Sequence, residues 1–349
     1  MKDIPQLEPD TIIDCDFARF RIKKLLGKGG FGAVYLVEET STLTKYAVKT
    51  ELVPVPGKDR FEPRLLWEET ILLAIQALPN PNHKKHFIKV VDRGNLPPLR
   101  FMLMTLVGKS LQDLKKAKKS QCFSHNTCWR VALQTLEALE AFHDAGFVHR
   151  DIKPHNYTIG AAGQEDIIFM LDFGLVRCYT GKKYETACKD TPSFAGTLKY
   201  CSRSSHYSVY QYPKDDFESW ISTILDLHDS NALFWKKALN NDDIKHLKND
   251  LFCLREPDFV FNDCVPFGYR NIIELVGNLT PQDKMKCPTA DMQKKPDYAI
   301  FYGALEELGK QYSFSQEKKF DWQRRSRANK NSISIEASNH ERKHSRHRR

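Results

Sequence analysis

The chain has 349 residues, which suits two lobes or one large domain with a tail. Hydrophobic residues make up 41% and charged residues 28%, and no apolar run approaches the roughly 18 residues that a membrane-spanning helix needs. The first 16 residues mix charges with prolines and lack the layout of a secretory signal, and nine singly spaced cysteines give no C-x-x-C pair, so we expect an intracellular protein without a zinc site or a disulfide framework.

The formal net charge of +9 is unevenly distributed. Residues 324–349 contain nine Lys or Arg against two acidic residues, so this segment carries +7 and the rest of the chain +2. Few apolar residues separate these charges, and the segment cannot bury enough surface to fold alone. We therefore expect a basic, disordered tail over 321–349. Two kinds of role stay open for it: a functional one, as a binding site for nucleic acid, acidic protein or a membrane surface or as a nuclear address, and simple solubilisation.

The first structural pattern covers residues 19–51, where apolar and polar side chains alternate around glycines. This alternation predicts three antiparallel strands. Apolar residues at helical spacing then predict a helix over 62–78, and the apolar segments 86–91 and 99–107 predict two more strands. We expect one helix packed on a five-stranded antiparallel sheet.

A glycine-rich motif connects the first two of these strands, Gly27-Lys28-Gly29-Gly30-Phe31-Gly32-Ala33-Val34. A dinucleotide-binding version of this G-x-G-x-x-G motif would open a helix, whereas here the strand pattern resumes at once. A hairpin that covers the phosphates of a nucleotide fits better, with glycine amides close to the phosphates and Val34 above the base. Taken alone, a plain turn would explain the glycines as well.

The third predicted strand contains Ala47-Val48-Lys49, which gives such a hairpin a cation for the α and β phosphates. An isolated lysine on a strand is otherwise usually a charge exposed to solvent. In the predicted helix, Glu68 shares a face with Ile71 and Leu72 and can reach Lys49 as an ion pair. Glu69 is the alternative partner, and it ranks second because it lies about 100° further round the helix.

The strongest pattern is His149-Arg150-Asp151-Ile152-Lys153-Pro154-His155-Asn156, followed sixteen residues later by Asp172-Phe173-Gly174. It lies between two predicted helices, Thr127–Ala145 and Phe217–Leu227. Phosphoryl transfer needs a carboxylate for the hydroxyl proton, a cation for the migrating group and oxygen ligands for Mg²⁺. Asp151, Lys153, and the pair Asn156 and Asp172 supply these in turn. His155 is not expected to bind this hard metal ion.

The order of these motifs resembles that of the eukaryotic protein kinases over residues 19–320, and within them the casein kinase 1 group. The group resemblance lies in Gly196-Thr197-Leu198-Lys199-Tyr200 and in Lys295-Pro296-Asp297-Tyr298. Gly146-Phe147-Val148 and Phe320-Asp321-Trp322 are similar to the tau-tubulin kinase branch. The resemblance implies an α+β, bilobal fold with an N-terminal extension at 1–18, an N-lobe at 19–107, a mainly helical C-lobe at 108–320 and the tail at 321–349.

The resemblance also implies roles for further residues. Met104 corresponds to the residue behind the adenine, and Thr105-Leu106-Val107 to the hinge that hydrogen-bonds it, although an ordinary core strand would look the same. Asp216 corresponds to a buried carboxylate that holds the catalytic-loop backbone, and a helix N-cap is its alternative. Lys189 and Lys199 correspond to a basic pocket for a substrate phosphate or acidic side chain, with plain exposed loop charges as the alternative.

One departure from most protein kinases is the absence of A-P-E, where Cys201-Ser202-Arg203-Ser204-Ser205-His206 stands instead, as in the casein kinase 1 group. We therefore expect constitutive competence rather than an activation-loop switch. Arg150 could still meet a phosphate added to one of four hydroxyl residues of that loop: Thr180, Thr186, Thr191 or Ser193.

The predicted function is that of an ATP- and Mg²⁺-dependent protein kinase. Lys153, two residues after Asp151, is the arrangement of serine/threonine kinases, and the basic pocket predicts substrates with acidic or phosphorylated flanks. The alternatives are a nucleotide-binding pseudokinase scaffold and a basic adaptor that acts through its tail, but the complete set of motif residues favours catalysis. We expect a monomer in the cytoplasm and also in the nucleus, with protein substrates as its partners.

Overall fold

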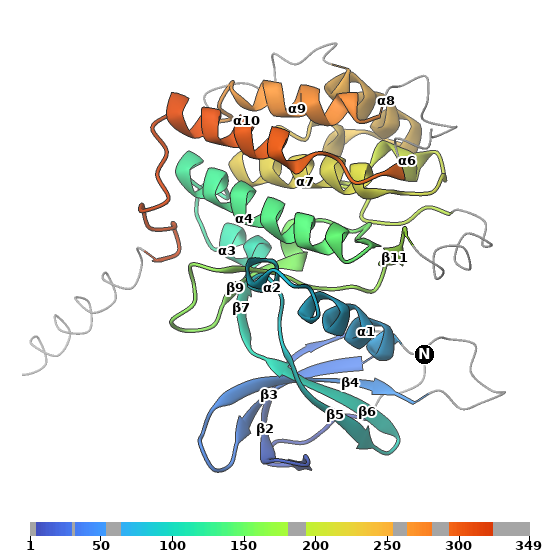
Figure 1. Cartoon of the computed structure of the whole chain (residues 1–349), viewed down its shortest axis with the longest axis vertical. Helices are drawn as coiled ribbons and strands as arrows, with labels where there is room; N and C mark the ends of the chain where they lie inside the picture. Colours follow the sequence, from blue (N-terminus) through green and yellow to red (C-terminus); the bar gives the residue numbers. More distant parts are fainter. Residues whose placement is uncertain are drawn as a thin grey trace, which may run out of the picture.

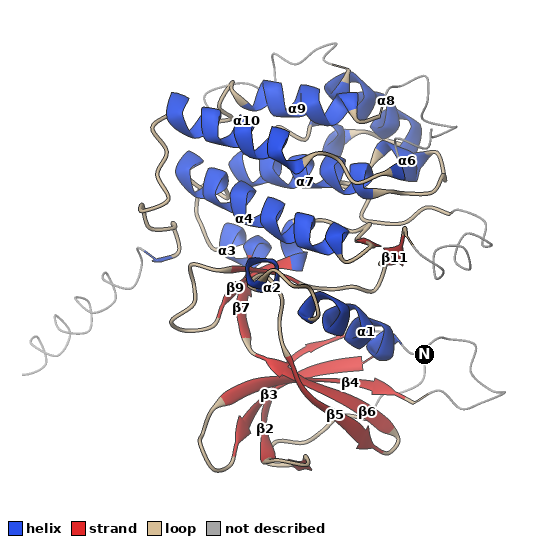
Figure 2. Ribbon diagram, viewed as in Figure 1, coloured by secondary structure: helices blue, strands red, loops and turns tan. Residues whose placement is uncertain are grey.

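The structure is a computed structural model, and it describes residues 5–29, 32–53, 64–180, 193–253, 264–280 and 293–323. Figure 1 shows a sheet with helix α1 in the lower part of the view and a stack of helices above it. The lower lobe is rich in strands and the upper lobe is mainly helical (Figure 2). The predicted α+β, bilobal fold is confirmed.

The N-lobe sheet is antiparallel and has the strand order β1-β2-β3-β4-β6-β5. Its strands are β1 (Ile12–Asp14), β2 (Arg19–Lys28), β3 (Gly32–Glu39), β4 (Lys45–Leu52), β5 (Val90–Leu96) and β6 (Leu99–Thr105). The prediction of five strands was wrong by one, because β1 lies in the expected N-terminal extension. Ile13 pairs with Phe20 and is buried with it, but a three-residue strand is too short to show a period.

The strand expected at 86–91 begins later, at Val90. Phe87 and Ile88 are buried, and the Phe87 ring lies 6.2 Å from that of Phe142 and 6.5 Å from that of Phe173 in the other lobe. This segment, which follows the short helix α2 (Pro81–Lys84), therefore packs its apolar residues between the lobes instead of alternating them across a sheet.

Helix α1 (Arg64–Gln76) buries the face that the sequence predicted, including Leu65, Ile71 and Leu72. Its first amides are bound by Glu51 of β4. Arg64 N donates to Oε1 at 2.9 Å, and Leu65 N donates to Oε2 at 3.1 Å. A carboxylate at a helix N-terminus satisfies free amides and complements the helix dipole, so it ties α1 to the sheet.

The C-lobe is built around α7 (Pro213–His228), whose residues are all buried. Around it lie α3 (Leu111–Lys116), α4 (His125–Asp144), α6 (Arg203–His206), α8 (Asn241–Phe252), α9 (Tyr269–Asn278) and α10 (Tyr298–Gln311), with 3-10 turns at Pro154–Asn156 and Phe234–Lys237. The apolar pattern predicted α7 only over Phe217–Leu227, because its first turn buries charged residues such as Lys214 and Asp215 in an ion pair.

Short strands form the floor between the lobes. Strand β7 (Val107–Ser110) pairs with β9 (Tyr157–Gly160), which pairs with β10 (Ile168–Met170), and β8 (Phe147–Val148) pairs with β11 (Arg177–Cys178). Residues 149–156 follow β8, and residues 171–176 connect β10 to β11. The sheet pairing thus brings the two strongest sequence motifs to one place.

Candidate functional site

The glycine hairpin joins β2 and β3, and Gly29 N donates to Gly32 O at 2.9 Å. Gly30 and Phe31 lie outside the described residues. A Cβ atom at Gly27 or Gly29 would meet no atom within 4 Å, whereas one at Gly32 would clash with the carbonyl oxygen of Thr50 in β4. Gly32 is therefore required for strand packing, and Gly27 and Gly29 border open space.

The strand register aligns the predicted nucleotide-contacting residues of the N-lobe. Gly27, which precedes Lys28 at the end of β2, pairs with Val34, and Val34 pairs with Lys49. In the next rungs Ala47 pairs with Met104, and both side chains are buried. Thr105 ends β6, Leu106 follows, and Val107 begins β7, so the predicted hinge is the crossing from one lobe to the other.

Lys49 forms an ion pair with Glu68 of α1, with 32% and 11% of the two side chains exposed. Burial opposes the charge of Lys49, but Glu68, and with it Asp172, favours the charged form and raises the pKa of the ammonium group. Glu69, the alternative partner, pairs with Arg93 instead. The geometry therefore selects Glu68 as the partner that fixes Lys49, and the charge of Asp172 adds to the stabilisation of the ammonium group.

Asp151 is buried and receives two charge-stabilising hydrogen bonds. Lys153 Nζ donates to Oδ2 at 2.6 Å, and Thr197 Oγ1 donates to Oδ1 at 2.7 Å. Burial opposes ionisation, but these two donors outweigh it and hold the pKa of Asp151 below its usual value. The sequence assigned no role to Thr197, and its only signal is its position in the Gly196–Tyr200 motif.

Asn156 and Asp172 are connected through the backbone. Asn156 Nδ2 donates to the Asp151 carbonyl at 2.8 Å, which leaves the amide oxygen as the atom available to a ligand. Leu171 N donates to Asn156 O at 2.8 Å, so the residue before Asp172 is bound to the catalytic loop. The Asp172 side chain is exposed. One amide oxygen and one carboxylate suit Mg²⁺, which prefers oxygen donors, and would leave its other positions to water and phosphate.

Asp216 lies in the first turn of α7, where Tyr212 rather than Asp216 is the N-cap. Its Oδ2 accepts a hydrogen bond from His149 N at 2.7 Å, and its Oδ1 accepts one from Arg150 N at 2.9 Å. Arg150 has a positive φ of 67°, a conformation that non-glycine residues rarely adopt without support. Asp216 thus fixes the backbone immediately before Asp151.

The predicted basic pocket is only partly described. Lys199 Nζ is 2.6 Å from Asp226 Oδ1, and the buried Asp226 also binds Lys115 at 2.7 Å, while Lys189 lies outside the described residues. Lys199 is therefore engaged in an ion pair rather than standing as a single exposed charge. The pocket itself stays a prediction.

Arg150 Nε donates to Leu175 O at 2.6 Å, and burial together with the nearby Arg177 lowers its pKa to about 10. The sequence predicts that Arg150 can bind a phosphate on one of four hydroxyl residues. Two of these, Thr186 and Thr191, lie outside the described residues. That contact also stays a prediction.

The segment that replaces A-P-E contains a buried ion pair that the sequence pattern did not reveal. Arg203 binds Glu218 of α7 through Nε at 3.0 Å and Nη2 at 2.9 Å, and its Nη2 also donates to Thr280 O at 3.1 Å. Both side chains are 1% exposed. Arg203 therefore anchors the end of the activation segment to the helical core.

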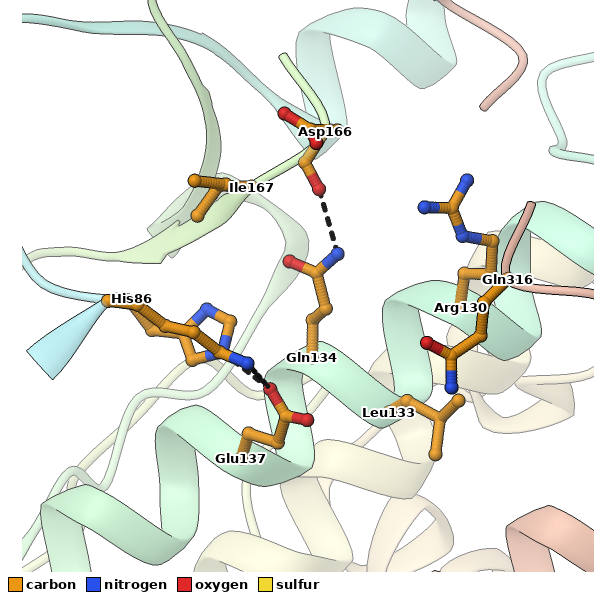
Figure 3. A pocket seen from close by; sticks show the side chains of 9 residues that line it. His86, Arg130, Leu133, Gln134, Glu137, Asp166, Ile167 and Gln316 are labelled. Atoms are coloured by element: carbon orange, nitrogen blue, oxygen red, sulfur yellow. Dashed lines mark hydrogen bonds and ion pairs between the residues drawn. The ribbon is translucent and has the colours of Figure 1, made fainter. Parts of the chain in front are cut away.

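A cavity of about 220 Å³ lies elsewhere, and none of the predicted site residues lines it. Figure 3 shows His86 and Glu137 on one side of it and Arg130 on the other. The buried His86 ring binds Glu137 at 2.8 Å and the Ile168 carbonyl at 2.7 Å. His86 and Glu137 therefore support β10, the strand that leads to Asp172.

Comparison with known proteins agrees with this geometry. Residues 20–298 match the family described as the protein kinase domain. A Caenorhabditis elegans protein named as a serine/threonine-protein kinase is 34% identical over 288 residues, which cover 76% of this chain and 72% of that protein. The serine/threonine-protein kinase spe-6 of the same organism is 26% identical over 320 residues, 91% of this chain and 79% of that protein. A third relative, named as a casein kinase I, is 32% identical over 213 residues, 60% of each chain.

Proposed function

Since this chain belongs to the protein kinase domain family, we propose that it transfers the γ-phosphoryl group of ATP to serine and threonine hydroxyls of proteins. Its relatives named as serine/threonine-protein kinases support this substrate class. The observation that carries the proposal is the ionised Asp151, held between Lys153 and Thr197 on a backbone fixed by Asp216.

The proposed reaction is a direct transfer. The substrate hydroxyl oxygen attacks the γ-phosphorus, its proton passes to Asp151, and the bond from phosphorus to the bridging oxygen of ADP breaks. Lys153 offers a positive charge to the migrating group from a position 2.6 Å from Asp151. Lys49, oriented by Glu68, would bind the α and β phosphates. Asn156 and Asp172 would hold Mg²⁺, which neutralises phosphate charge when bound.

We also propose membership of the casein kinase 1 group, near the tau-tubulin kinase branch, and a preference for acidic or phosphorylated flanks. The Gly196–Tyr200 and Lys295–Tyr298 motifs and the relative named as a casein kinase I support the group. Lys199 is bound to Asp226, and 31% of its side chain is exposed beside the activation segment. Its positive charge supports an acidic substrate.

The domain boundaries proposed are 1–18 for the extension, 19–107 for the N-lobe, 108–320 for the C-lobe and 321–349 for the tail, of which the first residues, Asp321 and Trp322, contact the C-lobe. The basic composition of residues 324–349 supports binding of an acidic partner or nucleic acid, and a protein found in the cytoplasm and the nucleus. In the part of the chain that the structure describes, no helix is long and apolar enough to cross a bilayer. A monomer is proposed.

An assay with magnesium and ATP tests the proposal directly. Purified protein, full length and truncated after Gln323, is given peptides that place acidic, phosphorylated or basic residues around one serine. We expect transfer to the serine, fastest with acidic or phosphorylated flanks. Nucleotide binding without any transfer would support the pseudokinase alternative, and faster transfer to the basic peptide would contradict the proposed pocket.

A further inference from the structure

A buried histidine outside the sequence motifs lies behind the catalytic loop. His143 is in the last turn of α4, and its side chain is 0% exposed. Its Nε2 lies 3.0 Å from Asp216 Oδ2, the oxygen that also accepts the amide of His149. Its Nδ1 lies 2.6 Å from the hydroxyl of Tyr298, the first residue of α10.

The partners of His143 determine which ring nitrogen carries the proton. The Asp216 carboxylate has no proton to donate, so Nε2 carries hydrogen and donates to it. In the neutral ring Nδ1 is then an acceptor, and the Tyr298 hydroxyl donates to it. Burial raises the pKa of Tyr298 well above its usual value, so the hydroxyl keeps its proton. Hydrogen bonds therefore run in one direction from Tyr298 through His143 to Asp216.

The two helices that carry Tyr298 and His143 are also tied together beside this contact. Lys295 forms an ion pair with Asp144, and Tyr302 OH donates to Glu140 Oε2 at 2.8 Å. The backbone carbonyl of His143 accepts a hydrogen bond from the hydroxyl of Tyr179, just after β11, at 2.8 Å. Three segments distant in sequence thus meet at this one residue.

We propose that Tyr298 and His143 are positioning residues for the phosphoryl transfer proposed above, acting through Asp216 on the backbone of the catalytic loop. Tyr298 holds the His143 ring in the orientation in which Nε2 donates to Asp216. Without the hydroxyl, the buried Nδ1 loses its donor and the ring loses one of its two anchors, so the ring can rotate and withdraw Nε2–H from the carboxylate. Asp216 would turn away, and the amides of His149 and Arg150 would lose their fixed acceptor.

The test compares two tyrosines on the same helix. Tyr298→Phe removes the relay hydroxyl, and Tyr302→Phe removes a hydroxyl that binds the same partner helix outside the relay. We expect Tyr298→Phe to lower kcat roughly 10-fold or more, with little change in the KM for ATP, because a small misplacement of Asp151 affects transfer more than nucleotide binding. Tyr302→Phe should leave kcat within about twofold of the parent at a similar loss of thermal stability.

Two His143 variants test the donor itself. His143→Gln keeps a side-chain N–H group that can reach Asp216, whereas His143→Phe keeps only the volume of the ring. We expect His143→Gln to retain more of the parent kcat than His143→Phe. Equal loss in both variants would show that the volume of the side chain, and not its proton, is what matters.

The kcat comparisons rest on the proposed function, because they require kinase activity. Hydrogen exchange does not, so it tests the role of Tyr298 independently. In the full-length protein, the amides of His149 and Arg150 should exchange at least about tenfold faster in Tyr298→Phe than in Tyr302→Phe. Equal exchange in the two variants, or equal kcat, would overturn the relay. If the parent protein transfers no phosphate at all, the function proposed above fails, but the exchange experiment still decides whether Tyr298 fixes the loop.

Discussion

Asp151 keeps a negative charge at a buried position, where loss of hydration would normally favour the neutral acid. Two donors from different segments compensate for this loss: Lys153 lies in the same loop, and Thr197 comes from the far end of the activation segment. Lys153 Nζ also donates a hydrogen bond to Thr197 Oγ1 at 3.0 Å, which helps to fix its position. The three side chains therefore act as a unit, and the charge of Asp151 depends on the fold of a distant segment.

Replacing the carboxylate tests its role as proton acceptor. Asp151→Asn should lower kcat by roughly 10²–10⁴-fold, the range typical for loss of a general base. Nucleotide affinity, measured by isothermal titration, should change little, because the carboxylate acts on the hydroxyl and not on ATP. Turnover equal to that of the parent would assign the proton acceptor elsewhere.

Thr197 offers a test through pH. Burial raises the pKa of Asp151, and the hydrogen bonds from Lys153 and then Thr197 lower it below its usual value. A lowered pKa keeps the carboxylate ionised as the pH falls, so Thr197→Val should raise this pKa and move the acidic limb of the pH–rate profile to higher pH. Thr197→Ser, which keeps the hydroxyl, should follow the parent profile. Identical acidic limbs in the parent and Thr197→Val would contradict this role.

Helix α7 is the element that organises the C-lobe, because three of its carboxylates bind three different segments. Asp216 holds the catalytic loop, Glu218 holds Arg203 of α6, and Asp226 holds Lys115 of α3. Buried charges of this kind are costly unless each has its partner. The helix can therefore exist in its buried position only when all three segments are in place.

Replacing the Arg203–Glu218 pair tests whether α7 depends on the partners of its buried charges. Arg203→Met should lower the free energy of unfolding by about 3–5 kcal/mol, because it leaves a buried carboxylate without its cation. Arg203→Met combined with Glu218→Leu should recover much of that loss. Urea denaturation measures all three proteins. A single variant as stable as the parent would mean that the pair contributes nothing.

The same pair sets a pH dependence of stability. Burial opposes ionisation of Glu218, but Arg203 outweighs it and lowers its pKa. A lowered folded-state pKa gives stability that is present above the unfolded-state value, about 4.3 for Glu, and is lost as the pH falls through the folded-state value. The difference in stability between the parent and the double variant should therefore shrink below about pH 4.

At the scale of the whole molecule, the chain closes on itself through residues 313–323, which run beside α4. Asp321 accepts hydrogen bonds from Ser124 N at 2.8 Å, Ser124 Oγ at 2.7 Å and Thr127 Oγ1 at 3.0 Å, at the start of that helix. Phe320 and Trp322 stack with ring centroids 4.4 Å apart. This segment caps the long helix of the C-lobe from a position almost 200 residues later, as the separation of 197 residues between Ser124 and Asp321 shows.

Two truncations separate this segment from the basic tail. Ending the chain after Gln323 should change the free energy of unfolding by less than about 0.5 kcal/mol, since the sequence predicts a tail without packing. Ending it after Tyr312 should cost about 3 kcal/mol or more, because the Asp321 contacts and the packing of Phe320 and Trp322 are lost. Equal stability of the two truncated proteins, measured by thermal unfolding, would show that the segment is only a spacer.

Local patterns in the sequence are enough to predict the order of the chemical groups and most of the regular structure. Phosphoryl transfer needs particular residue types at short spacings, so the motifs around Lys49 and Asp151 are visible locally, as are the periods of β2 to β4, α1 and α4. The residues that cooperate with these groups are known only from the fold: Glu68 rather than Glu69 pairs with Lys49, Thr197 binds Asp151, and Tyr298 binds His143, which lies 155 residues away. The fold also added β1 and the charged first turn of α7. Contacts between distant residues leave no trace in local periodicity, because their free energy arises only when the chain brings the partners together and excludes water around them.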